Sequence, residues 1–196
     1  MIITTVYQSL GDRNNLKVVR ENGPYPCKRE NAWLGEGFYF WDTHVELAHW
    51  WGKVGYSNRY YIGKSSVEIN QDCWDLHGNG NHQKEFESII QEMAIENLYV
   101  AKKTTVRKVI EYIKKHIGFE NLYEGIRMLG CDSINSSKPF NHKFLERVNL
   151  SDKIEINAYF DVKPAVQLCL FESCSLNRKG FEIVYPEYYD EDTIVI

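Results

Sequence analysis

The residues best suited to chemistry lie in one short stretch, Leu34-Gly35-Glu36-Gly37-Phe38-Tyr39-Phe40-Trp41-Asp42. Two glycines one residue apart precede four consecutive aromatic residues, and a helix-like segment containing Ala48 and Trp50 follows. Glycine at such a position lets the backbone approach a ligand closely, or turn where a side chain would clash. Tyr39 and Trp50 could then present flat faces to a planar, cationic ring.

This stretch resembles the nicotinamide-binding motif of the ADP-ribosyltransferases, particularly the poly(ADP-ribose) polymerase branch. In that motif a Gly-x-Gly-x-Tyr-Phe strand runs into a helix that carries an alanine and a second aromatic residue. Asp42 and Ala48 match the pattern, and Trp50 stands where many members have tyrosine. Leu47 replaces a serine that hydrogen-bonds the carboxamide in that branch, so one nicotinamide contact is missing.

The resemblance implies that the substrate is NAD and that Gly37, Phe38, Tyr39 and Trp50 help to bind it. Tyr39 and Trp50 would sandwich the nicotinamide ring. Breaking the bond between nicotinamide and ribose depends mainly on positioning and electrostatic stabilisation. The resemblance therefore implies no metal cofactor.

Two flanking segments match the family in order along the chain. Gln8 falls where the family has a histidine at the end of its first strand, and Ser9 falls on the following glycine. The Gln8 amide would hydrogen-bond the adenosine-side ribose, and the main chain of Ser9 would hold the carboxamide. Gln167 falls on the position of the catalytic glutamate, as in a looser group of bacterial relatives in which glutamine precedes an apolar run.

Glutamine at this position keeps a contact to the ribose hydroxyl but lacks the charge, so transition-state stabilisation should be smaller. We expect Gln167 and Tyr39 to be the catalytic residues, with Glu172 as an alternative carboxylate. A solvated glutamate at a strand end is the simpler interpretation of Glu172.

Three functions remain open from the sequence. The first is an NAD-dependent mono-ADP-ribosyltransferase acting on an unknown macromolecular or small-molecule acceptor, as in a bacterial toxin, a defence effector or a phage-encoded modifier. The second is a catalytically weak or inactive module that binds NAD or ADP-ribose on the same fold. The third is an interaction domain in which the aromatic strand is only core.

The amino-acid composition does not decide between these three functions. The chain has 196 residues, a net charge of −4, 43% hydrophobic and 14% aromatic residues, so nucleic acid is not indicated as a partner by charge. The N-terminus lacks the pattern of a signal peptide, and no stretch is apolar for long enough to span a membrane. Five scattered cysteines without a Cys-x-x-Cys pair indicate reduced thiols and a cytoplasmic location.

The periodicity predicts one α+β domain over residues 1–196, with split antiparallel β-sheets, flanking helices and a helical insert at roughly 83–129. A capping box formed by Thr43 and Glu46 would begin the first helix. The predicted helices cover residues 43–53, 83–99, 105–117 and 119–129. The predicted strands cover residues 2–7, 37–41, 60–69, 131–134, 154–160, 165–172 and 181–185, and a polar loop spans residues 8–34.

Two further patterns have simpler interpretations. Cys73, Asp75, His77 and His82 could suggest a metal site, but their spacing matches no standard zinc motif and a polar turn is favoured. Lysines and arginines between residues 102 and 115 form a basic stretch. A solvated helix face explains it, and a patch for RNA or phosphate is the less favoured alternative.

Overall fold

The computed structural model describes residues 1–116, 118–130, 143–151, 154–161 and 163–186. Helices and strands are mixed, which confirms the predicted α+β class. The helices are α1 (Leu16–Asn22), α2 (Val45–Gly55), α3 (Gly80–Ile95) and α4 (Val106–His116), with short 3-10 turns at Phe119–Asn121 and Ser175–Asn177. The strands are β1 (Ile2–Gly11), β2 (Phe38–Asp42), β3 (Tyr60–Ile69), β4 (Cys73–Asp75), β5 (Gly125–Leu129), β6 (Lys143–Ser151), β7 (Ile154–Asp161), β8 (Val166–Leu170) and β9 (Lys179–Tyr185).

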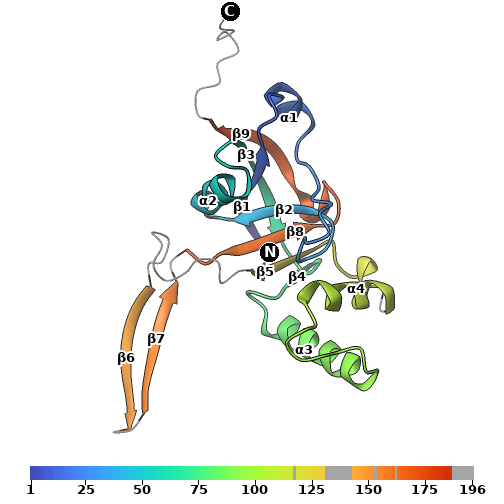
Figure 1. The fold of residues 1–196 in the computed structure, drawn as a ribbon, viewed down its shortest axis with the longest axis vertical. Coiled ribbons are helices and arrows are strands. Elements are labelled where there is room, and N and C mark those ends of the chain that lie inside the picture. The colour runs from blue at the N-terminus through green and yellow to red at the C-terminus, as the bar shows by residue number, and fades with distance from the viewer. Residues whose placement is uncertain (117, 131–142, 152–153, 162, 187–196) are drawn as a thin grey trace, which may run out of the picture.

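Seven strands form one sheet in the order β4-β5-β8-β2-β1-β3-β9. Neighbouring strands in this sheet are antiparallel, except for the parallel pair β4–β5. The sheet is therefore mixed and continuous, where split antiparallel sheets were expected, because β8 pairs with both β2 and β5 and joins the two groups of strands. Among the described residues, strands β6 and β7 pair only with each other, as a hairpin that extends away from the large sheet (Figure 1).

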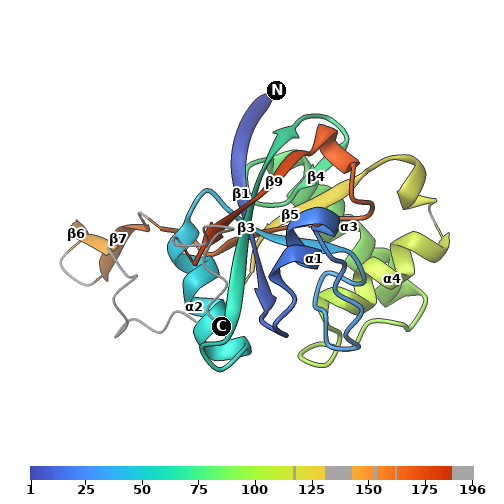
Figure 2. The ribbon, with the colours of Figure 1, turned by 90° about the horizontal axis from the view of Figure 1, so that it is seen from above.

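The helices cover different parts of the sheet. Helix α2 packs against β1, β2 and β3, and it lies apart from α3 and α4 in both views (Figures 1 and 2). Leu47 and Ala48 of α2 are completely buried against Trp41 and Ile62. Helices α3 and α4 bury their apolar faces in a second cluster around Trp74.

The start of α2 differs from the prediction. The helix begins at Val45 with His44 as its N-cap residue, and no side chain caps it. Thr43 has a positive φ of 62° and its hydroxyl donates to Asp42 Oδ1 at 2.9 Å. The capping box expected from Thr43 and Glu46 is therefore wrong, because the Thr43 hydroxyl is used one residue back.

Two other segments were predicted incorrectly. Residues 8–34 include the end of β1 and all of α1, so they are not one loop. The helix predicted for residues 119–129 is only a 3-10 turn followed by β5. All five residues of β5 pair with β8, so sheet pairing overrides the helix-forming tendency of Arg127 and Met128. The strand predicted at residues 131–134 lies outside the described residues.

The sequence predicted no membrane-spanning segment and predicted reduced cysteines. Within the described ranges no helix combines the length and apolar character needed to cross a bilayer. Cys27, Cys73, Cys169 and Cys174 are free thiols, and Cys131 lies outside the described residues.

Candidate functional site

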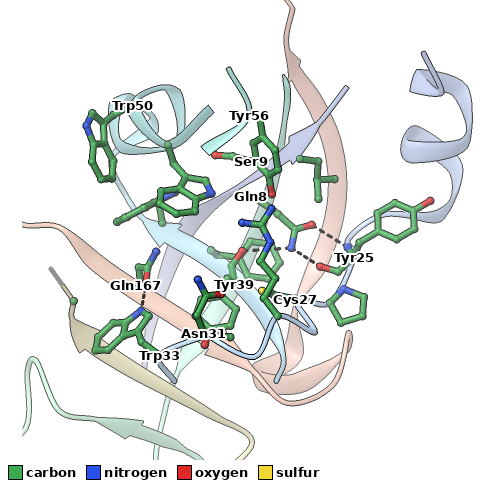
Figure 3. A pocket seen from close by; sticks show the side chains of 18 residues that line it. Gln8, Ser9, Tyr25, Cys27, Asn31, Trp33, Tyr39, Trp50, Tyr56 and Gln167 are labelled. Carbon is green, nitrogen blue, oxygen red and sulfur yellow. Dashed lines mark hydrogen bonds between the residues drawn. The ribbon is translucent and has the colours of Figure 1, made fainter. Parts of the chain in front are cut away.

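A cavity of about 470 Å³ opens between β1, β2, α2 and the segment of residues 24–37, which we call the strap. Its volume is within the range of small-molecule sites, roughly 300–1,000 Å³. Its wall is formed by residues of the strap and by side chains of β1, β2, α2 and β8 that are far apart in the sequence (Figure 3). The lining residues are Gln8, Ser9, Leu10, Tyr25, Pro26, Cys27, Arg29, Asn31, Ala32, Trp33, Tyr39, Phe40, Trp41, Trp50, Trp51, Tyr56, Gly130 and Gln167.

The cavity lies where β1 and β2 diverge. These strands pair at Val6–Asp42 and Tyr7–Trp41. The carbonyl of Thr5 accepts a hydrogen bond from Thr43 N, so the odd residues of β1 turn their main-chain groups towards β2. The N–H and C=O of Ser9 therefore face the gap beyond the last pair. They offer one donor and one acceptor to a ligand, as an amide such as a carboxamide requires.

Gln8 closes part of this gap with its own amide. Its Nε2 donates to the carbonyls of Tyr25 at 2.8 Å and Tyr39 at 3.3 Å, and its Oε1 accepts from Tyr25 N at 2.9 Å. The side chain is 3% exposed. Gln8 thus lines the cavity, but its polar atoms hold the strap against β1 and β2. The predicted ribose contact would compete with these bonds.

Tyr39 is fixed on the floor of the cavity, between Cys27 and Asn31 in Figure 3. Its hydroxyl donates to the Gly35 carbonyl and accepts from Leu34 N, both at 2.8 Å. Burial raises the pKa of Tyr39 well above its usual value. The phenol is therefore neutral and occupied, so Tyr39 can offer a ring face but is poorly suited to proton transfer.

Trp50 lies at the end of the cavity that α2 forms (Figure 3). Its ring meets Trp41 edge-to-face, with centroids 6.0 Å apart and planes at 80°. Tyr39 instead packs on the cluster around Trp74. The two rings thus belong to separate hydrophobic clusters while lining one cavity.

Gln167 faces the cavity from β8, directly opposite Trp41 of β2. The side chains of directly opposed residues share a face, so Gln167 lies on the cavity side of the sheet. Its Oε1 accepts a hydrogen bond from Trp33 Nε1 of the strap at 2.5 Å. The structure thus brings Gln8, Ser9, Tyr39, Trp50 and Gln167 to one site.

Three other predicted residues do not line the cavity. Phe38 packs in a cluster on the other face of the sheet. A Cβ on Gly37 would stand 2.5 Å from the Leu170 carbonyl, so this glycine permits close approach of β8 rather than of a ligand. Glu172 is exposed and lines a different cavity of about 520 Å³, together with Glu36 and Glu124. Its role as an alternative catalytic carboxylate is not favoured by this position.

Sequence reasoning missed the contribution of the strap, especially Arg29 and Trp33. Arg29 is the only charged residue among the described residues that line the cavity, and its guanidinium lies 5.6 Å from the Tyr56 ring centroid. Arg107 of α4 donates to the main-chain carbonyls of Arg29, at 3.3 Å, and Glu30. The one local signal was the pair Trp33-Leu34, which is apolar within a polar loop.

The side chain of His82, near β4, has a structural partner. His82 Nδ1 accepts a hydrogen bond from Asp75 N at 2.9 Å. In the described ranges, no group of three histidine, cysteine or acidic residues is arranged to hold a metal ion.

Comparisons of the chain with protein-family models, with curated proteins and with solved structures found no match.

Proposed function

We propose that the cavity binds NAD and that the protein is an ADP-ribosyltransferase-like enzyme that cleaves the nicotinamide–ribose bond. One observation carries this proposal. Residues from the three segments that resemble the family lie on adjacent strands, β8-β2-β1, and line the same cavity. Ser9 and Gln167, which match the family in order along the chain, thus line the same cavity as Tyr39, and this supports the proposal.

The nicotinamide, its ribose and the diphosphate each have a chemically suitable partner in this proposal. The nicotinamide ring lies against Tyr39, towards Trp50, and its carboxamide binds the outward-facing main chain of Ser9. Gln167 contacts the nicotinamide ribose. Arg29, at the exposed strap, can pair with the diphosphate, because guanidinium groups form paired, charge-assisted hydrogen bonds with phosphate oxygens.

The expected activity is weak. An amide at residue 167 cannot supply the negative charge that stabilises a developing oxocarbenium ion. Gln8 holds the strap with both of its Nε2 hydrogens, so it has no free donor for the ribose. We therefore expect slow transfer of a single ADP-ribose unit, or slow hydrolysis. The acceptor is unspecified.

These same two glutamines favour a second candidate, a module that binds NAD or ADP-ribose without turnover. Incubation with NAD labelled in both the nicotinamide and the adenine separates the two. Release of labelled nicotinamide, abolished in Gln167→Ala, supports the enzyme. Saturable binding in calorimetry without release supports the module. The absence of both binding and release would refute the proposed function.

A further inference from the structure

The hydrogen bond between Trp33 and Gln167 determines which way the Gln167 amide points. An indole N–H can only donate, so the atom that faces Trp33 Nε1 at 2.5 Å must be the amide oxygen. The Gln167 NH2 group is then turned away from Trp33. Figure 3 shows this pair at the edge of the cavity. The network itself thus settles the orientation of the amide, which is otherwise an assignment.

Trp33 is held in place from two sides. A Cβ on Gly130 would stand 2.4 Å from Cζ2 of the indole, so the ring packs directly on a position that only glycine leaves open. The next two residues of the strap are fixed by the Tyr39 hydroxyl, which binds Leu34 N and the Gly35 carbonyl. The indole is therefore a preorganised partner of Gln167.

We infer that Trp33 is a positioning residue that fixes Gln167 as a hydrogen-bond donor towards the ligand. The inference rests on the proposed function, because the ligand atom that Gln167 reads is an oxygen of the nicotinamide ribose. A glutamine free to flip could offer either a carbonyl or an NH2 group. With its carbonyl bound to Trp33, it recognises an acceptor atom, and the strap sets this specificity.

A double-mutant cycle tests the inference with ADP-ribose and free nicotinamide as probes. Trp33→Phe keeps a ring on Gly130 but removes the N–H. We expect the affinity for ADP-ribose to fall about threefold to tenfold, as for loss of one neutral hydrogen bond. In the Gln167→Ala background the same substitution should change the affinity less than twofold. Nicotinamide lacks the ribose, so its affinity should be unchanged by Trp33→Phe.

Gly130→Ala provides a second variant that acts through the same ring, by displacing the indole. It should reproduce the loss for ADP-ribose in the presence of Gln167 and not in its absence, and thermal melting checks that each variant is folded. An equal loss in both backgrounds, or no loss for Trp33→Phe, would overturn the inference. If the unaltered protein binds neither NAD, ADP-ribose nor nicotinamide, the proposed function itself fails.

Discussion

Two polar clusters lie on opposite faces of the sheet around β2, and they differ in how they use charge. On one face Arg127 bridges two carboxylates, with Nε 2.7 Å from Asp42 Oδ2 and Nη1 3.0 Å from Asp75 Oδ1. On the other face lies the cavity, with the amide of Gln167. The side chains of the charged cluster are mostly buried and pair with one another, whereas Gln167 faces a cavity.

The difference shows that charge density alone does not identify a site. Asp42 also accepts from the Thr4 and Thr43 hydroxyls, and Asp75 from the N–H groups of His77 and Gly78. The carboxylates of Asp42 and Asp75 thus have their hydrogen-bond partners within the protein. The cavity has uncharged amides, aromatic rings and one arginine, so it retains groups for a ligand.

The largest expected effect on stability comes from breaking the charged cluster. Arg127→Met leaves Asp42 and Asp75 without their cation, and Asp42 is 5% exposed. Loss of one partner from a buried ion cluster costs about 3–5 kcal/mol, measured as the free energy of unfolding in urea. The control is Lys64→Met, which removes an exposed partner of Glu182 and should cost less than about 1 kcal/mol. A loss equally small for Arg127→Met would show that the cluster is not structural.

A smaller effect separates the two glutamines. Gln8→Ala leaves the Tyr25 N–H without a partner and should lower the free energy of unfolding by about 1–3 kcal/mol. Gln167 is half-buried and faces the cavity, so Gln167→Ala should change stability little and should instead lower the affinity for ADP-ribose. Denaturation and calorimetry on the same samples measure both quantities. If Gln8→Ala were as stable as the unaltered protein, its role in holding the strap would be wrong.

Arg29 is expected to act on affinity alone. Arg29→Ala should weaken NAD binding about tenfold, because a charge-assisted bond to phosphate is lost, and should reduce the salt dependence of binding. Lys28→Ala is the matched control, since Lys28 neighbours Arg29, pairs with Glu36 and does not line the cavity. Equal effects of both substitutions would indicate general attraction rather than a diphosphate contact.

The smallest effect concerns pH. Burial is the main cause that lowers the pKa of His77, with Arg127 adding to it and Asp75 and Asp42 opposing it. Below the ordinary histidine pKa of about 6.5 the unfolded chain binds a proton more readily than the fold does, so stability falls as pH decreases. His77→Gln should therefore lose less stability between pH 7.5 and 5.5. Urea midpoints at both pH values measure this, and equal losses would contradict it.

The sequence predicted those parts that depend on local patterns. Strand β3 was expected at residues 60–69, where the structure has it, and the aromatic motif indicated β2. The sequence could not show that Gln8 bonds to Tyr25 and Tyr39, because these partners are 17 and 31 residues away. Helix α1 was missed because it is short and buries only Leu16 and Val19.

The strap was the main omission at the candidate site. Trp33 reaches Gln167 across 134 residues, and no periodicity connects them. The glycines of the motif were noted for ligand approach, yet Gly37 instead accommodates β8. Residue types indicated a ring-binding site, but only the tertiary structure shows which polar atoms remain for a ligand.

The most direct test is a crystal structure with an NAD analogue whose glycosidic bond resists cleavage. The account predicts the pyridine ring against Tyr39 inside the cavity, the carboxamide on the main chain of Ser9, and a ribose oxygen at the Gln167 NH2 group. An empty cavity at saturating analogue, or the analogue seated in the cavity that contains Glu172, would contradict it.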